Sequence, residues 1–458
     1  MVERPPVVMS VAGFDPISGA GVTSDVKTVE ALGGYGVAVV TCIAIQNTAG
    51  VTKIVPLDPS DVALQIDTIV SDVEVSAVKI GALPNEAVID IVAEKVPKLG
   101  APIVLDPVLA PTRGPRFLDR VGVEALRERL IPIATVVTPN VSEARELTGI
   151  EIGSERDLVK AARALVEDLG AKAALVKGFR DGRCVKDALY IDDGTSRVFA
   201  RGDLGIDVHG LGCVLSSAIA TYLARGHTII DAVSRGIEFA LDAALTALPI
   251  GKGRRCPNHL ARLRRDSYIL ESIDRVREAV KTVESLGDLL RPLIPEVGMN
   301  IVEAPPPPLA RGVDDCVGVE GRIVRSRDGV KACGCVARGA SSHLARAVLE
   351  AQKLDPSIRA CANVKPFPEL ERVARELGLL AVFVDRREEP PEVREVEGAS
   401  IPWIVRRAYE IASRVPDIVY DAGDVGKEPM ARIFGRSATD VVTKVVRLAR
   451  AYRRFQRE

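Results

Sequence analysis

Short apolar segments and longer amphipathic ones alternate through the N-terminal half of the chain. The apolar segments are rich in Val and Ile, as strands buried on both faces of a sheet are. They cover residues 7–11, 37–45, 77–80, 103–105, 135–137 and 173–176. Helix-length stretches separate them, among others at 62–73, 86–98 and 155–169. This alternation predicts an α/β fold in which helices flank a doubly wound parallel sheet.

The C-terminal half regains α/β character after an interruption. Residues 251–258 break the helical pattern with Gly, Pro and charge, and 266–286 then shows helical spacing. After four prolines at 305–308, the pattern predicts a strand at 379–385, an apolar segment around 317–324 and helices at 342–354, 369–377, 403–413 and 438–453. We therefore predict a first domain over 1–250, a linker over 251–265 and a smaller α/β domain over 266–458.

Composition and charge exclude several classes of protein. At 458 residues two domains are expected, and 61 Lys and Arg against 62 Asp and Glu do not indicate nucleic acid or membrane as a partner. The N-terminus lacks a signal-peptide pattern, and no apolar stretch reaches the roughly 18 residues of a membrane helix. Eight cysteines are too few for a disulfide scaffold, which favours a cytoplasmic protein. The sequence leaves the formation of a homo-oligomer open.

A glycine turn precedes the apolar helix expected after residue 210. Gly210 and Gly212 open this helix, Cys213 lies in its first turn, and Gly226 is placed for a left-handed C-terminus. Unpaired backbone N–H groups and the helix dipole make such a turn a site for phosphate. The same field is expected to lower the pKa of the Cys213 thiol. The alternative is a tight turn followed by a cysteine that packs as a small hydrophobe.

Polar residues follow the carboxyl ends of the predicted strands. They are Asp15, Gln46, Lys79, Asp106, Asn140 with Glu143, and Lys177. Ligands bind at this edge of doubly wound sheets. Together these residues supply an acid pair for Mg²⁺, lysine for phosphate and an amide for a flat polar substrate. Each also has a structural alternative, because Asn140 is suited to cap the next helix and the lysines to end strands in solvent.

The order of these motifs resembles the hydroxymethylpyrimidine/phosphomethylpyrimidine kinase family over about the first 245 residues. The motifs are Gly13-Phe-Asp-Pro with Gly19-Ala-Gly21, Gln46-Asn-Thr48, Lys79-Ile-Gly81, Asp106-Pro-Val108, Thr138-Pro-Asn140 with Glu143, Lys177-Gly178 and His209-Gly-Leu-Gly-Cys213. The resemblance implies a ribokinase-like fold and a kinase that uses ATP and Mg²⁺.

The family resemblance also implies roles for single residues. Asp15 and Gln46 bind the pyrimidine substrate, and Cys213 is the proposed base. Asn140, Lys177, Gly210 and Gly212 bind ATP or phosphate, and Asp106 and Glu143 hold the metal. The family's usual Thr and Met are replaced here by Leu211 and Ala82, which makes the substrate preference harder to infer.

Candidate catalytic and binding residues of the second half lie in or beside the loops between its predicted helices and strands. Arg322, His343, Arg386 and Lys427 follow or precede predicted elements. Local structural roles are the alternative, because Ser341 or Ser342 is suited to cap the helix carrying His343, and Arg386 to pair with Glu388 or Glu389.

These connections resemble the archaeal thiamine-phosphate synthase domain over about 287–452. The matching segments are 295–300, 321–323, 341–343, 385–390 and 426–429. The resemblance implies that a pyrimidine diphosphate is coupled to thiazole phosphate with loss of pyrophosphate. Arg322, Arg386 and Lys427 are suited to hold the phosphate groups, and His343 to transfer a proton or donate a hydrogen bond.

The leading hypothesis is therefore a bifunctional enzyme of thiamine biosynthesis with small-molecule substrates. A second hypothesis keeps the kinase and makes the rear domain a non-catalytic ligand sensor. The third is a general vitamin kinase, for example for pyridoxal, with an inert partner domain. The presence of both Arg322 and His343 favours catalysis in the rear domain.

Overall fold

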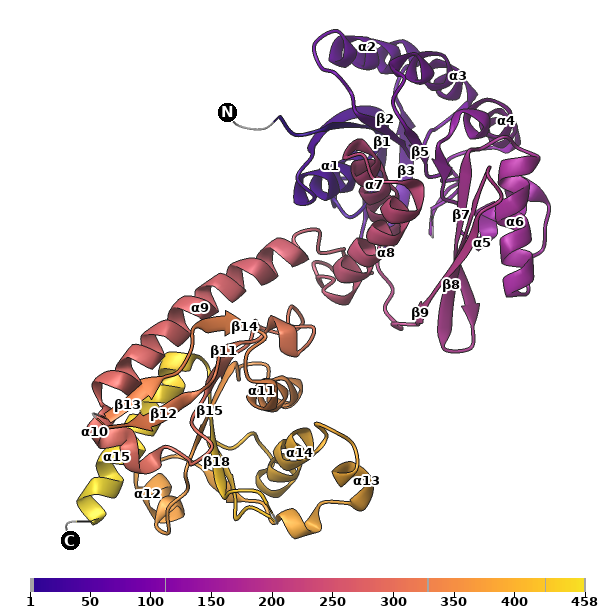
Figure 1. The fold of residues 1–458 in the computed structure, drawn as a ribbon. Coiled ribbons are helices and arrows are strands. Elements are labelled where there is room, and N and C mark those ends of the chain that lie inside the picture. The colour runs from indigo at the N-terminus through magenta and orange to yellow at the C-terminus, as the bar shows by residue number, and fades with distance from the viewer. Residues whose placement is uncertain (1–3, 112, 328, 425, 457–458) are drawn as a thin grey trace. The chain divides into compact units, whose positions relative to one another are not determined.

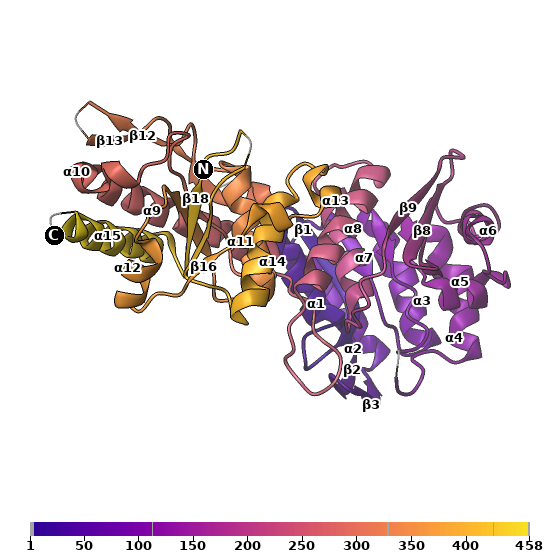
Figure 2. The ribbon, with the colours of Figure 1, turned by 90° about the horizontal axis from the view of Figure 1, so that it is seen from below.

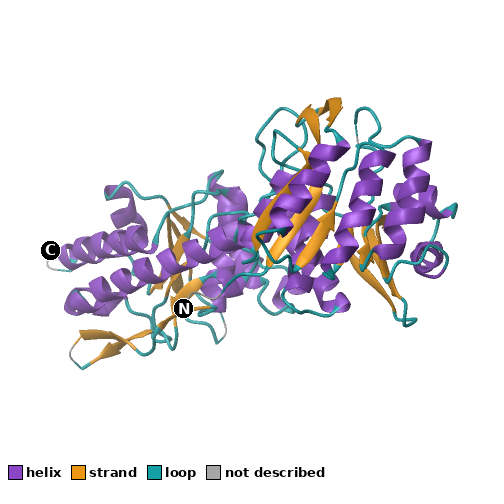
Figure 3. Cartoon of the chain, turned by 90° about the horizontal axis from the view of Figure 1, so that it is seen from above, coloured by secondary structure: helices purple, strands orange, loops and turns teal. Residues whose placement is uncertain are grey.

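The computed structural model describes residues 4–111, 113–327, 329–424 and 426–456. The chain divides into two compact units, Met1–Ala261 and Arg262–Glu458. Both units are α/β, with helices packed on a central sheet (Figure 1, Figure 3). None of the helices in the described ranges is long and apolar enough to cross a membrane.

The first unit is built on a nine-stranded sheet in the order β3-β2-β1-β4-β5-β6-β7-β8-β9. The strands are β1 (Val7–Phe14), β2 (Tyr35–Asn47), β3 (Gly50–Pro56), β4 (Ala77–Ile80), β5 (Ile103–Leu105), β6 (Val136–Val137), β7 (Ala173–Asp181), β8 (Cys184–Ile191) and β9 (Ser196–Gly202). Strands β2, β1, β4, β5, β6 and β7 are parallel, as the apolar pattern predicts. Strands β3, β8 and β9 are antiparallel additions at the edges.

Helices cover both faces of this sheet. They are α1 (Gly21–Ala31), α2 (Pro59–Val70), α3 (Glu86–Lys95), α4 (Arg120–Ala125), α5 (Val141–Thr148), α6 (Glu155–Glu167), α7 (Leu211–Ala224) and α8 (Ile229–Leu245), with short helical turns at Val96–Leu99, Leu126–Leu130 and Ile131–Ile133. One core lies under α1, α7 and α8, and the other under α2 to α6. The doubly wound prediction is confirmed.

Residues 251–258, expected to begin a linker, are bound into the first unit. The backbone N–H of Arg254 donates to the carbonyl of Thr48 at 2.9 Å, and that of Asn258 donates to Ala243 at 3.0 Å. His259 is buried against Ser24, with 2.7 Å between its Nε2 and the serine hydroxyl. Gly, Pro and charge therefore mark an ordered loop here, because its backbone finds partners on the adjoining sheet and helix.

The second unit contains a seven-stranded sheet in the order β14-β11-β10-β15-β18-β17-β16, and a separate β12–β13 hairpin. The strands are β10 (Ile301–Glu303), β11 (Val317–Val319), β12 (Ile323–Ser326), β13 (Gly329–Ala332), β14 (Val336–Arg338), β15 (Ala360–Val364), β16 (Ala381–Phe383), β17 (Ile418–Asp421) and β18 (Met430–Gly435). Except for the parallel pair β16–β17, neighbouring strands are antiparallel. A smaller α/β domain follows the first, as predicted.

Helices again form two layers in this unit (Figure 2). They are α9 (Ala261–Ser285), α10 (Gly287–Leu290), α11 (Ser342–Leu354), α12 (Leu370–Glu376), α13 (Pro391–Arg394), α14 (Ser400–Ala412) and α15 (Ala438–Phe455), with turns at Arg291–Leu293, Val313–Asp315 and Arg386–Glu388. Helices α9, α10, α12 and α15 share one core, and α11 and α14 the other. Helix α9 begins before residue 266 and buries Ile269, Val276 and Val283 in the second unit's core.

Candidate active site

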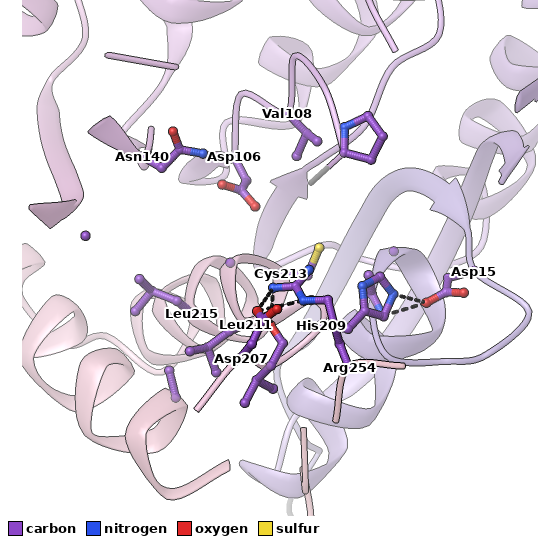
Figure 4. A pocket seen from close by; sticks show the side chains of 18 of the residues that line it. Asp15, Asp106, Val108, Asn140, Asp207, His209, Leu211, Cys213, Leu215 and Arg254 are labelled. Atoms are coloured by element: carbon purple, nitrogen blue, oxygen red, sulfur yellow. Dashed lines mark hydrogen bonds and ion pairs between the residues drawn. The ribbon is translucent and has the colours of Figure 1, made fainter. Parts of the chain in front are cut away.

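A cavity of about 580 Å³ lies at the carboxyl ends of the first unit's parallel strands (Figure 4). Nine residues predicted for the kinase site line it, whereas Lys79, predicted at the same edge of the sheet, is not among the lining residues. The nine are Asp15, Gln46, Asp106, Asn140, Glu143, Lys177, Gly210, Gly212 and Cys213. They come from separate strand ends and from the first turn of α7. The sheet topology therefore brings together residues that are far apart in the sequence.

The glycine turn shapes one wall of the cavity. Gly210 has φ 78°, and a Cβ there would lie 1.9 Å from the carbonyl oxygen of Gly19, so only glycine fits. A Cβ on Gly212 would lie 3.3 Å from Asp106 Oδ2, directly where a ligand must approach. No side chain in the described ranges caps α7. Its first N–H groups are thus suited to bind a phosphoryl group.

The Cys213 thiol differs from the sequence-based expectation. Burial raises its pKa to about 11, although the nearby Lys79 cation opposes this shift. The expectation of a lowered pKa is wrong because desolvation of the thiolate outweighs the favourable charges. At neutral pH the thiol is therefore mostly protonated.

The cation behind Cys213 is part of a buried network. Lys79 is fully buried, and its Nζ lies 2.8 Å from Asp25 Oδ2. The hydroxyls of Ser10 and Ser217 donate to the same carboxylate at 2.6 and 2.7 Å. Burial alone would lower the pKa of Lys79, but the charge of Asp25 raises it above its usual range. The alternative that Lys79 is a solvated strand end is wrong.

Asp106 and Lys177 form a second ion pair at the cavity wall. Lys177 Nζ donates to Asp106 Oδ1 at 2.7 Å, and the Thr138 hydroxyl donates to the same oxygen at 3.1 Å. Burial would raise the pKa of Asp106, but the cations of Lys177 and Lys79 hold it below its usual value. The carboxylate is ionised, and these bonds leave Oδ2 on the side of Gly212.

Asn140 and Glu143 form a capping box at the start of α5. Asn140 Oδ1 accepts from the Glu143 N–H at 2.9 Å, and Glu143 Oε2 accepts from the Asn140 N–H at 2.8 Å. The capping alternative for Asn140 is thus confirmed. Burial and the charge of Asp106 raise the pKa of Glu143, and Lys177 opposes this.

Both carboxylates still have an oxygen that these contacts do not use. Asp106 keeps Oδ2 and Glu143 keeps Oε1, and both residues line the cavity. Two hard oxygen ligands completed by substrate phosphates suit Mg²⁺ better than a transition metal. The described residues hold no group of three or more His, Cys, Asp or Glu side chains that could bind a metal ion.

Asp15 organises the loop after β1. Its carboxylate accepts from the backbone N–H groups of Ile17, Gly19 and Ala20 at 3.0, 3.1 and 2.8 Å. His209 Nε2 lies 3.0 Å from Asp15 Oδ2 (Figure 4). Burial would raise the pKa of Asp15, but hydrogen bonds from His209 and Gln46 lower it. Asp15 therefore positions the Gln46 amide and the glycine turn.

Sequence reasoning did not assign two cavity residues, His209 and Arg254. Arg254 Nε donates to Asp207 Oδ1 at 2.7 Å (Figure 4). Its Nη2 donates to the Val208 carbonyl at 2.9 Å. Arg254 lies in the stretch interpreted as a linker. The glycines on its N-terminal side were the available signal, since a Cβ on Gly253 would lie 2.2 Å from the Thr48 carbonyl oxygen.

In the second unit, three of the predicted segments converge. Arg322 has φ 73° and donates from Nη1 to the Val297 carbonyl at 2.6 Å. The N–H groups of Glu296 and Val297 donate to the Glu428 carboxylate at 2.9 and 3.2 Å. The segments containing Val297, Arg322 and Glu428 are therefore tied together, and the Arg322 and Lys427 side chains are exposed there.

His343 lies in the first turn of α11. Partial burial and then the charges of Arg346, Arg322 and Arg432 lower its pKa, so the imidazole is neutral at pH 7. Ser341 is the N-cap residue with φ 60° and makes no side-chain capping bond within the described ranges. Of the two serines suited to cap this helix, Ser341 therefore occupies the N-cap position, but its side chain does not make the capping bond.

Arg386 is buried in a cluster of four charges. Its guanidinium nitrogens lie 3.7 Å from Glu389 Oε2 and 3.9 Å from Asp421 Oδ1. Asp421 Oδ2 accepts from Arg432 Nη1 at 2.8 Å. The predicted pairing with Glu389 is therefore present, but it is buried and loose rather than a surface ion pair.

Comparisons with known proteins match both units. The family model for phosphomethylpyrimidine kinase matches residues 15–258, and that for thiamine-phosphate synthase ThiN matches residues 275–447. The bifunctional thiamine biosynthesis protein ThiDN of Methanocaldococcus jannaschii is 30% identical over 452 residues, covering 97% of this chain and 99% of that protein. The hydroxymethylpyrimidine/phosphomethylpyrimidine kinase of Rhizobium meliloti is 40% identical over 265 residues, 57% of this chain and 99% of that protein.

Solved structures resemble the first unit. Pyridoxal kinase of Bacillus subtilis in an ADP complex has a TM-score of 0.53 at 29% identity, covering 57% of this chain and 99% of that chain. Pyridoxal kinase of Staphylococcus aureus with AMP-PCP and pyridoxal has a TM-score of 0.52 at 29% identity, covering 57% of this chain and 96% of that chain.

Fold and cavity thus define the first unit as a ribokinase-like small-molecule kinase. The chain belongs to the phosphomethylpyrimidine kinase family, and specifically to its bifunctional thiamine biosynthesis members, in which a thiamine-phosphate synthase ThiN domain follows the kinase. Both resemblances indicated by the sequence motifs are confirmed. The chain is a bifunctional enzyme of thiamine biosynthesis, with kinase and thiamine-phosphate synthase activities.

Proposed function

We propose that the first unit uses ATP to phosphorylate 4-amino-5-hydroxymethyl-2-methylpyrimidine and then its monophosphate. The second unit couples the resulting diphosphate to thiazole phosphate, giving thiamine phosphate and pyrophosphate. The convergence of the glycine turn, two carboxylates, Lys177 and the Gln46 amide on one cavity carries the kinase assignment. The matches of both family models support a kinase activity followed by a synthase activity.

In the kinase site, each group has a distinct task. The N–H groups of the turn at Gly210 and Gly212 bind the transferred phosphoryl group, and Lys177 and Asn140 bind ATP phosphates. Gln46 binds the pyrimidine edge, because an amide both donates and accepts hydrogen bonds. Cys213, near the Lys79 cation, takes the proton of the attacking alcohol.

Asp106 and Glu143 would hold Mg²⁺ in this site. When bound, the ion neutralises charge on the phosphate oxygens. Lys177 keeps Asp106 ionised and therefore ready to act as a ligand.

In the synthase site, the reaction separates a diphosphate from a carbon atom. The exposed cations of Arg322 and Lys427 are placed to bind phosphate groups, while the buried Arg386 binds another part of the substrate. The neutral His343 imidazole is able to donate a hydrogen bond or accept a proton.

A reconstitution tests the whole proposal. The purified chain is supplied with the pyrimidine alcohol, thiazole phosphate, ATP and Mg²⁺, and thiamine phosphate is quantified. Omitting ATP should stop product formation, and supplying the pyrimidine diphosphate should restore it. Thiamine phosphate that is absent even with the diphosphate would favour a ligand-sensing second unit instead.

Gln46→Ala is expected to weaken pyrimidine binding by roughly 10-fold or more, because it removes hydrogen bonds to a polar ring. Nucleotide affinity should remain unchanged. The KM values for pyrimidine and ATP measure both effects. Asn47→Ala is the matched control, since its side-chain oxygen already accepts from Ala49 N–H at 2.8 Å. An unaltered pyrimidine KM in Gln46→Ala would count against this binding site.

The second unit, produced alone as residues 262–458, is expected to keep its synthase activity. Its core includes α9 residues such as Val276 and Val283, so the fragment must contain that helix. A fragment that starts at residue 287 should instead lose cooperative unfolding. Circular dichroism and the coupling assay with supplied diphosphate measure both results, and an inactive but folded 262–458 fragment would contradict the expectation.

A further inference from the structure

Glu389 is a buried acid to which no described residue donates a hydrogen bond. It is 3% exposed, and neither carboxylate oxygen has a hydrogen-bond partner among the described residues. Nε of the neighbouring Arg386 is also buried without a partner in those ranges. The 3.7 Å separation between Glu389 Oε2 and the Arg386 guanidinium is too long for a hydrogen bond.

The surrounding groups do not satisfy this pair. Asp421 is already engaged, because Oδ1 accepts from the Gly423 N–H at 2.9 Å and Oδ2 from Arg432 at 2.8 Å. Buried polar groups are nearly always hydrogen-bonded, and burying an unpaired carboxylate costs free energy. An acceptor and a donor left open beside each other match a ligand that presents a donor beside an acceptor.

We propose that Glu389 and Arg386 recognise the aminopyrimidine ring of the diphosphate substrate in the second unit. Glu389 accepts from the exocyclic amino group, and Arg386 Nε–H donates to the adjacent ring nitrogen. The ring edge of a 4-aminopyrimidine presents this donor beside an acceptor, whereas the thiazole phosphate has no N–H donor to offer. The assignment rests on the proposed synthase function and specifies which part of the substrate Arg386 binds.

The same contact contributes to the reaction. The C–O bond to the diphosphate breaks with its electron pair on the leaving group, and the thiazole nitrogen lone pair forms the new C–N bond. The methylene carbon becomes electron-poor between these events and draws electron density from the amino group through the ring. The amino N–H therefore becomes a stronger donor, so its bond to Glu389 strengthens in the transition state.

The test combines an enzyme variant with a substrate variant. The wild-type chain and Glu389→Gln are assayed with the normal pyrimidine diphosphate and with an analogue that has hydrogen in place of the amino group. We expect the wild type to prefer the amino substrate by about 100-fold or more in kcat/KM. Glu389→Gln should lose most of this preference, because its kcat/KM falls for the amino substrate. Its kcat/KM for the analogue should change only a few-fold.

Glu388→Gln is the matched control, because Glu388 is an exposed neighbour whose carboxylate pairs with Arg407 at 2.8 Å. It should leave the preference intact. In Glu389→Gln, an unchanged thermal unfolding midpoint and thiazole phosphate KM separate ring recognition from a general structural loss.

Four results would overturn the assignment. Equal use of both substrates by the wild type would overturn it without any variant, so the test still works if Glu389→Gln fails to fold. If Glu389→Gln keeps the full preference for the amino substrate, Glu389 is not the acceptor for the amino group. The same conclusion follows if Glu389→Gln loses activity and extra Mg²⁺ restores it. A wild type that makes no thiamine phosphate from the normal substrates overturns the proposed synthase function itself, and this assignment with it.

Discussion

Replacing Cys213 with Ser is expected to slow phosphorylation of the pyrimidine alcohol by roughly 10²–10⁴-fold, the usual contribution of a positioned base. The second phosphorylation, of the monophosphate, should be much less affected. Cys213→Ser keeps the size of the side chain and the backbone of the glycine turn. It removes the more easily ionised thiol.

The two steps differ because their nucleophiles differ. An alcohol is a poor nucleophile at neutral pH, so its proton must leave in the transition state. A phosphate oxygen is already anionic and needs no base. Both steps use the N–H groups of the glycine turn and the carboxylates of Asp106 and Glu143 equally. Loss of the base should therefore slow the first phosphorylation much more than the second.

The pKa of the Cys213 thiol adds a second readout. Since burial raises this pKa to about 11, the thiolate fraction grows about tenfold per pH unit below that value. The rate of the first phosphorylation relative to the second should therefore rise from pH 7 to 9 in the wild type. In Cys213→Ser this ratio should be flat.

Cys42→Ser is the control, since Cys42 is also buried with a pKa of about 11 but lies in β2 outside the set of cavity-lining residues. Equal losses in both phosphorylation steps of Cys213→Ser would show that Cys213 is not the base.

Much of the kinase site was predictable because local sequence signals and topology agree. Apolar runs marked the parallel strands, and their carboxyl ends necessarily share one edge of the sheet. The glycine turn was also predictable, because Gly210 and Gly212 directly precede an apolar helix in the sequence. In the structure no other residue fits at position 210 against Gly19. The edge strands β3 and β9 were missed because they are half-exposed and carry no continuous apolar run.

Properties that depend on the packed environment were not predictable. The pKa of Cys213 moved opposite to the helix-dipole expectation because burial is a property of the whole unit. The cluster of Arg386, Glu389, Asp421 and Arg432 joins residues from a turn and two strands, and only the first two are close in sequence. Spacing alone gives no indication that such charges meet in one buried site.

In the second unit, Arg322→Ala and His343→Ala are each expected to lower synthase kcat/KM by roughly 10²–10³-fold. Arg322→Ala removes an exposed cation needed by a departing diphosphate, and His343→Ala removes the neutral imidazole. The kinase rate of the same variants is the internal control, because the first unit is unaltered.

Two conservative changes refine this expectation. Arg322→Lys keeps the charge but loses the forked donor, so it should recover only part of the activity.

The lowered pKa of His343 means that wild-type synthase activity should persist to below pH 6.5 and fall only as the imidazole becomes protonated. In His343→Gln this acid limb should disappear along with most of the rate. Near wild-type synthase rates in both alanine variants, with both folded, would remove Arg322 and His343 from the site and favour a ligand-sensing role for this unit.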